Sequence, residues 1–163
     1  MDWKTLYLNA NGRIGQRDFW IGWVILFVAT LILGLIPVIG HIIGLVLIYP
    51  TVCVYSKRLH DFGKSGWLVA IPYAVFIIAA VIGVIAGGSA ILMGASAGAN
   101  ASAAAAGALG GLGLMMLFLL IAFVVAIAFL LWVGLSKGDA GPNRYGPPPV
   151  SLTGGAGTNF TPA

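Results

Sequence analysis

Residues 19–56 read FWIGWVILFVATLILGLIPVIGHIIGLVLIYPTVCVYS, a stretch of 38 residues without a single Asp, Glu, Lys or Arg. About 20 apolar residues cross a bilayer once as a helix, so this stretch is long enough for two crossings. Pro37 and Gly40 near its middle favour a tight turn between two helices. The sequence therefore predicts a first span over about residues 19–36 and a second over about residues 38–55.

A second uncharged stretch, residues 65–136, predicts two further spans, over about residues 66–86 and 112–135. The segment between them, residues 87–111, is rich in Gly, Ala and Ser, a composition typical of a flexible loop or of frayed helix ends. Ala101–Ala106 is also able to extend a helix. Three glycine pairs have the spacing that lets helices approach closely, which indicates tight packing at the outer ends of the spans: Gly40/Gly44, Gly83/Gly87 and Gly107/Gly111.

The composition of the 163-residue chain agrees with a membrane environment. Apolar residues make up 60% of it and charged residues 7%, whereas a soluble domain carries about 25% charged residues. In a membrane protein the positions of the charges along the chain matter more than their sum. The net charge of +4 is therefore no sign of nucleic-acid binding, and we expect no nucleic-acid partner. The predicted fold class is all-α: a polytopic membrane protein with four transmembrane helices in a small bundle, surrounded by the lipid bilayer.

All eight basic residues fall on one side of the predicted membrane. They precede the first span (Lys4, Arg13, Arg17), separate the second span from the third (Lys57, Arg58, Lys64) or follow the fourth (Lys137, Arg144). Cytoplasmic loops are enriched in Lys and Arg, so both termini are expected in the cytoplasm. The predicted organisation is a cytoplasmic N-terminal segment (1–18), a transmembrane domain (19–135) and a cytoplasmic tail (136–163), which is disordered after about residue 149.

Three polar segments face this predicted cytoplasmic side. They are residues 11–20 (NGRIGQRDFW), residues 57–67 (KRLHDFGKSGW) and residues 141–147 (GPNRYGP). These motifs resemble those of the bacterial inner-membrane proteins grouped as domain of unknown function 805, and the resemblance extends over about residues 11–149. It implies a small integral protein of the bacterial inner (plasma) membrane, and it implies no established biochemical activity.

The chain departs from the pattern of that family in three places. Gln16 stands where a basic residue is common, and Pro148 stands where the family usually has Asp. The segment 87–111 looks like an insertion relative to compact members. The sequence does not indicate what these differences change, and it does not indicate the oligomeric state.

We expect the three polar segments to fold together beneath the spans as a structural or binding cluster. Asp18 and Asp61 are predicted to pair with some of Arg13, Arg17, Arg58 and Arg144, and Asn143 and Tyr145 to dock the C-terminal turn. The candidate residues are Arg13, Arg17, Asp18, Lys57, Arg58, His60, Asp61, Lys64, Asn143, Arg144 and Tyr145. The remaining positive charge suits anionic lipid headgroups or an acidic protein partner, with about 1 kcal/mol for each Lys or Arg near the surface.

A noncatalytic scaffold or binding module is therefore the leading interpretation, with no catalytic residue assigned. One alternative is a membrane-surface enzyme that uses His60 as base and Asp61 as orienting group. Another is a small oligomeric pore, although the four spans contain no Asp, Glu, Lys or Arg of the kind that usually marks an ion pathway. The single cysteine, Cys53, and the two isolated histidines give no metal-ligand spacing, so no metal and no cofactor are expected.

Overall fold

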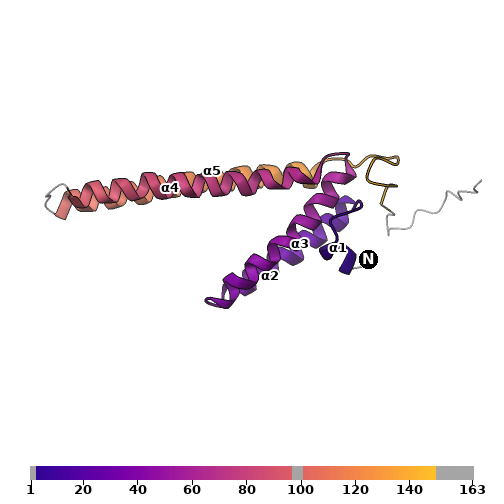
Figure 1. The fold of residues 1–163 in the computed structure, drawn as a ribbon, viewed down its shortest axis with the longest axis horizontal. Helices are drawn as coiled ribbons and strands as arrows, with labels where there is room; N and C mark the ends of the chain where they lie inside the picture. The colour runs from indigo at the N-terminus through magenta and orange to yellow at the C-terminus, as the bar shows by residue number, and fades with distance from the viewer. Residues whose placement is uncertain (1–2, 97–100, 150–163) are drawn as a thin grey trace, which may run out of the picture. The chain divides into compact units, whose positions relative to one another are not determined.

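The computed structural model describes residues 3–96 and 101–149, and the helices in this part of the chain are connected by turns. In chain order they are α1 (Trp3–Leu8), α2 (Gln16–Gly34), α3 (Ile39–Asp61), the short 3-10 helix η1 (Gly66–Val69), α4 (Ala70–Ser96) and α5 (Ala101–Leu135) (Figure 1). The all-helical fold class is confirmed for these residues. The tail that was predicted to be disordered after about residue 149 lies outside the described part.

Contacts divide the chain into two compact units. The first unit comprises Met1–Gly66 and Ser136–Ala163, and so contains α1, α2, α3 and the segment that follows α5. The second unit, Trp67–Leu135, contains α4 and α5. The packing of all four spans into one bundle stays a prediction.

In the first unit, α2 and α3 form a hairpin that reverses at Leu35–Val38 (Figure 1). A Cβ atom on Gly40 would collide with the backbone carbonyl of Leu33, so only glycine lets the start of α3 come this close to the end of α2. Because the two helices are antiparallel, the start of α2 and the end of α3 meet at the opposite, polar end of the hairpin.

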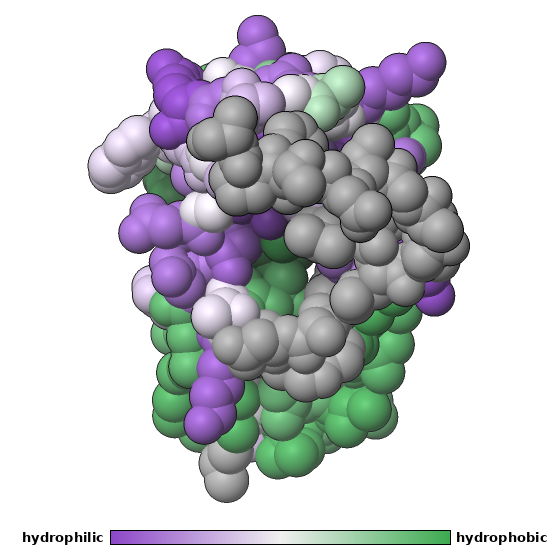
Figure 2. Space-filling view, turned by 90° about the vertical axis from the view of Figure 1, so that its right-hand side faces the viewer, coloured by the Kyte–Doolittle hydropathy of each residue, from purple (hydrophilic) through white to green (hydrophobic). Residues whose placement is uncertain are grey.

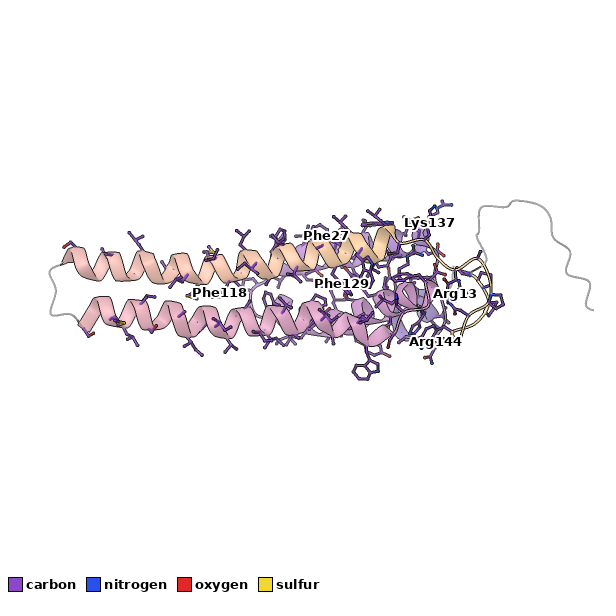
Figure 3. The ribbon with its side chains drawn as sticks, turned by 90° about the horizontal axis from the view of Figure 1, so that it is seen from above. Arg13, Phe27, Phe118, Phe129, Lys137 and Arg144 are labelled. Atoms are coloured by element: carbon purple, nitrogen blue, oxygen red, sulfur yellow. The ribbon has the colours of Figure 1, made fainter. Side chains whose placement is uncertain are left out.

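In the second unit, α4 and α5 run side by side as a long hairpin (Figure 3). A Cβ atom on Gly87 would lie 2.5 Å from the backbone oxygen of Gly111, and one on Gly107 would lie 2.6 Å from the Cα atom of Gly94. These glycines thus hold the two backbones in close contact, as their spacing predicted. Gly44 has no neighbour within 4 Å of such a Cβ atom, so the spacing at Gly40/Gly44 does not mark a packed pair.

The prediction of a loop over residues 87–111 is wrong for most of that segment. Helix α4 continues to Ser96, and α5 begins at Ala101. Alanine has the highest intrinsic helix propensity, and the interleaved glycines remove the steric obstacle to helix packing. A composition that suits a flexible linker in water therefore forms a tightly packed helical hairpin here.

Within residues 3–96 and 101–149, four helices are long and apolar enough to cross a membrane: Gln16–Gly34, Ile42–Asp61, Gly66–Gly94 and Ala105–Leu135. At most 33% of the residues in any of their apolar windows are buried inside the protein, so large apolar surfaces remain for lipid to cover. Each predicted span overlaps one of these helices. The main difference on the polar side is that α3 continues to Asp61, which places Lys57, Arg58 and His60 on the helix itself.

Candidate functional site

The polar end of α3 terminates in a Schellman motif. Gly63 has a φ of +70°, its N–H donates to the carbonyl of His60 at 3.1 Å, and the N–H of Lys64 donates to the carbonyl of Leu59 at 2.9 Å. This pair of bonds satisfies carbonyls that a helix end otherwise leaves without partners. The helix is therefore rigid up to Asp61, and Arg58 and Asp61 lie one turn apart on the same face.

Asp61 accepts hydrogen bonds from two arginines, one on each carboxylate oxygen. Its Oδ1 accepts from Nε and Nη2 of Arg13 at 3.1 and 3.0 Å, and its Oδ2 accepts from Nη1 of Arg58 at 2.5 Å. The side chains of Arg13 and Arg58 are each 1% exposed, and that of Asp61 is 4% exposed. Charged hydrogen bonds of this kind are strong, and burial makes the loss of any one partner costly.

Arg13 also holds the C-terminal strap, which we define as residues 137–149. Its guanidinium donates to the carbonyls of Asp139 at 2.6 Å, Gly141 at 2.8 Å and Gly146 at 3.2 Å, and to the carbonyl of Asp61 at 3.1 Å. The buried triad carries two positive charges and one negative charge, so these carbonyl dipoles stabilise the excess positive charge. Arg13 thereby joins the N-terminal segment, the end of α3 and the strap.

Backbone packing fixes the first residues of the strap against Asp61. The N–H of Asp139 donates to the backbone carbonyl of Asp61 at 2.8 Å. A Cβ atom on Gly138 would lie 2.8 Å from Cγ of Asp61, so glycine is required for this approach. Arg58 adds a further bond, from its Nη2 to the carbonyl of Ser136.

The remainder of the strap forms a tight turn that docks on His60. Asn143 and Gly146 exchange backbone hydrogen bonds at 3.1 and 3.0 Å, and the side-chain amide of Asn143 donates to the carbonyl of His60 at 3.0 Å. The ring of Tyr145 stacks on the ring of His60, with centroids 3.7 Å apart and planes 11° apart. His60 also contacts the N-terminal segment, because its Nδ1 lies 3.2 Å from the carbonyl of Gly12. A carbonyl only accepts hydrogen bonds, so we assign the ring proton to Nδ1.

We call this assembly the polar clasp; its side chains are those of Arg13, Arg58, His60, Asp61, Asn143 and Tyr145. Arg13 lies among the turns of the strap in Figure 3, where Arg144 lies at the same end of the molecule. Figure 2 shows hydrophilic side chains gathered on one part of the surface and hydrophobic side chains covering the lower part of the same view. The Nη2 atom of Arg144 donates to the carbonyl of Gly63 at 3.2 Å. With Arg144 included, the clasp brings together seven of the candidate residues.

Four candidate residues lie outside the clasp. Arg17 and Lys64 are exposed, and Lys57 faces α1 instead. Asp18 forms no ion pair within residues 3–96 and 101–149, contrary to the predicted pairing; it lies in the first turn of α2, where the helix dipole stabilises a carboxylate. Arg144 likewise contacts a carbonyl and the ring of Tyr145, at 4.7 Å from its centroid, rather than an acid.

Gly138 and Asp139 lie outside the three polar segments, so the sequence does not predict them as parts of the site. Gly138 and Gly141 contribute through their backbones, and a backbone acceptor leaves no side-chain signal in a sequence. Asp139 also uses its side chain, because its Oδ2 accepts from the amide of Asn143 at 2.8 Å. In the part of the chain that is described, no group of three or more His, Cys, Asp or Glu side chains is placed to hold a metal ion.

Parts of this chain are similar in sequence to known proteins. YiiR of Escherichia coli (strain K12), named as an uncharacterized protein, is 42% identical over 65 residues, which cover 36% of this chain and 44% of YiiR. YhaH of the same organism, named as an inner membrane protein, is 28% identical over 97 residues, which cover 48% of this chain and 80% of YhaH. The chain thus spans less than half the length of YiiR, and no solved structure matches it.

The family comparison covers a larger part of the chain. Residues 7–104, which are 98 of the 163 residues, match the model described as "Protein of unknown function (DUF805)". The match includes two of the three segments that form the clasp, those around Arg13 and around Asp61, and it ends before the strap. The chain therefore belongs to the DUF805 family.

Proposed function

We propose that this chain is a noncatalytic, multi-pass protein of the bacterial inner membrane whose clasp forms a rigid cytoplasmic platform for anionic phospholipid headgroups. The membrane assignment is supported by the four apolar helices and by the name of YhaH. The proposal places both termini in the cytoplasm, because all eight basic residues lie on one side of the spans. The bonds from Arg13 to the strap support a shared side, since they join the N-terminal and C-terminal segments.

The observation that carries the proposal is the double occupation of Asp61 by buried arginines. The charges at the centre of the clasp are used internally, to hold three segments together. Among the exposed bases of the same unit, Arg17, Lys64 and Lys137 lie outside the clasp and are available for external contacts. Figure 3 shows Lys137 pointing away from the strap. A rigid base that presents mobile cations is suited to attract phosphate headgroups.

A structural role for His60 and Asp61 is favoured over a catalytic one by their contacts. A base–carboxylate pair needs the carboxylate on the imidazole, with the second ring nitrogen open to substrate. Here the carboxylate of Asp61 faces Arg13 and Arg58, and Nδ1 of His60 faces the carbonyl of Gly12. Nε2 of His60 packs toward Gly66, where a Cβ atom would lie 3.0 Å from it.

The test is lipid retention by purified protein. We replace Arg17, Lys64 and Lys137 together by Gln and measure, by mass spectrometry, the phosphatidylglycerol and cardiolipin that remain bound after detergent extraction. Three surface cations contribute about 3 kcal/mol together, so we expect the affinity for anionic lipid to fall roughly 100-fold. The variant should therefore retain much less anionic lipid. Phosphatidylethanolamine provides the internal control, because its retention should not change.

Equal retention of anionic lipid by the triple variant would refute the proposal. If the variant instead loses a co-purifying acidic protein, the platform binds protein rather than lipid. A separate experiment tests the orientation, with single cysteines in place of Lys64 or Lys137 in otherwise native protein. A membrane-impermeant maleimide should label them in inverted vesicles and not in intact cells.

A further inference from the structure

Side chains of α3 hydrogen-bond to the backbone of α1 and attach α1 to α3. The Nζ atom of Lys57 donates to the carbonyl of Thr5 and lies 3.5 Å from that of Leu6. The hydroxyl of Tyr49 donates to the carbonyl of Leu8 at 3.0 Å. Two side chains of one apolar helix thus reach three carbonyls at the end of α1.

The position of α1 along the hairpin follows from its other contacts. A Cβ atom on Gly22 would lie 3.3 Å from Cδ2 of Leu6 and 3.6 Å from the side chain of Val54, and the hydroxyl of Tyr7 donates to the carbonyl of Gly22 at 3.3 Å. Gly22 lies six residues into α2, and Val54 lies seven residues before the end of α3. At 1.5 Å per residue, both points are about 10 Å inside the polar end of the hairpin. Helix α1 therefore lies beside the spans.

The carbonyls that receive these bonds are the ones that a helix leaves unsatisfied. The last four carbonyls of an α-helix have no partner inside the helix, and in α1 they are those of residues 5–8. In water such groups are hydrated, but within a membrane they need partners from the protein. The ammonium group of Lys57, a residue that is 5% exposed, also complements the negative end of the helix dipole. These contacts are those expected of a helix end that water does not reach.

The chain then reverses and returns to the polar end. The N–H of Asn11 donates to Oδ1 of Asn9 at 2.8 Å, and Gly12 has a φ of +93°, so a side-chain turn and a left-handed glycine redirect the backbone. Gly15 lies just before α2, at the end where Arg13 enters the clasp. Residues 3–15 thus run inward along α3 and back again.

We infer that residues 3–15 form a re-entrant segment in the interfacial layer of the membrane, and that phospholipid covers the outward face of α1. Leu8 marks this face, because it is 63% exposed and lies beside Tyr49, an exposed residue of α3 that donates to its carbonyl. The inference goes beyond the proposed binding of headgroups by Arg17, Lys64 and Lys137, because it rests on different residues. It refines the cytoplasmic assignment of the N-terminal segment, because residues 3–15 lie in the interfacial layer on the same side of the membrane.

The experiment measures the depth of spin labels in proteoliposomes of phosphatidylethanolamine and phosphatidylglycerol. Single cysteines replace Leu8, Lys64 or Leu45 in the full chain, with Lys64 as the water-exposed reference and Leu45 as the lipid-exposed reference on α3. The native Cys53 is 0% exposed, so unsubstituted protein reports any background labelling. Accessibility to oxygen and to a polar nickel chelate then gives the depth of each label.

We expect the label at Leu8 to favour oxygen over the chelate by several-fold relative to Lys64, with a depth between the two references. Chelate accessibility equal to that at Lys64 would overturn the inference. Lys57→Met, combined with the label at Leu8, should increase label mobility and chelate access because the carbonyl partners of α1 are lost. If that variant does not fold, the depth of Leu8 in the otherwise native chain still decides the question.

Discussion

Replacement of Arg13 by Met removes a side chain that hydrogen-bonds to both of the other segments of the clasp. Met keeps much of the length and the apolar volume of Arg13, but it donates no hydrogen bond. The carboxylate of Asp61, whose side chain is 4% exposed, keeps only its bond to Arg58, and three carbonyls of the strap each lose one donor. Removal of one partner from a buried ion pair costs about 3–5 kcal/mol. The strap carbonyls add little, because Asp139 and Gly141 are exposed enough for water to replace the guanidinium.

This cost falls on the docking of the strap. A loss of about 3–5 kcal/mol raises the undocked fraction by roughly 150- to 5,000-fold, whereas α2 and α3 keep their own packing. Hydrogen exchange followed by mass spectrometry, on protein in nanodiscs, measures this in the peptide that covers residues 137–146. We expect that peptide of the Arg13→Met variant to exchange that much faster than in the native protein. The N–H of Asp139, which donates to Asp61 in the native protein, is the most informative amide.

Arg17→Met is the matched control, because it removes an exposed arginine four residues away and should leave exchange of the strap unchanged. Native protection of the strap in the Arg13→Met variant would refute the reasoning. Equal loss of strap protection in the Arg13→Met and Arg17→Met variants would also refute it, because the removal of any positive charge would then explain the effect.

Three further predictions concern positions where the structure offers a close comparison. Gly87→Ala should lower the unfolding free energy of the second unit by about 1–3 kcal/mol, because its Cβ atom has no room against α5; Gly88→Ala, with nothing within 4 Å, should be neutral or stabilising by up to about 1 kcal/mol. Equal effects in denaturant titrations of the two variants would contradict the packing. Gly63→Ala should cost about 1–2 kcal/mol, since alanine resists a φ of +70°, and exchange at the end of α3 should rise accordingly. Tyr145→Ala should speed exchange of the strap by about tenfold or less through loss of the stack on His60, whereas Tyr145→Phe keeps the ring and should exchange like the native protein.

The sequence predicted the elements whose physical signal lies in the side chains. Hydrophobic length located the four helices, and the charges around Asp61 predicted its pairing with Arg13 and Arg58, which is confirmed. The docking of the C-terminal turn through Asn143 and Tyr145 is confirmed by their contacts with His60. The pairing is predictable because a buried carboxylate needs a basic partner, and the bases of this chain are confined to a few short segments.

The features that the sequence did not predict depend on backbone geometry or on the solvent. Arg13 binds carbonyls of the strap, and every residue offers a carbonyl, so no residue type marks the acceptors. The composition of residues 87–111 is that of a linker in water, whereas residues 87–96 and 101–111 are helical and pack closely through their glycines. The position of α1 depends on contacts of Tyr49 and Lys57, which the hydrophobic pattern of α3 does not distinguish from other residues of that helix.

The central claim, that the N-terminal and C-terminal segments are held together in one clasp, is tested most directly by a disulfide between them. A Cβ atom on Gly15 would lie 4.0 Å from Cγ of Pro149, so cysteines at these two positions would be neighbours, whereas a Cβ atom on Gly12 has no neighbour within 4 Å. We expect the pair Gly15→Cys and Pro149→Cys to cross-link in membranes under mild oxidation, as measured by mass spectrometry of the linked peptides. The pair Gly12→Cys and Pro149→Cys should remain largely reduced. Absence of the first cross-link, or equal yields from both pairs, would contradict the clasp.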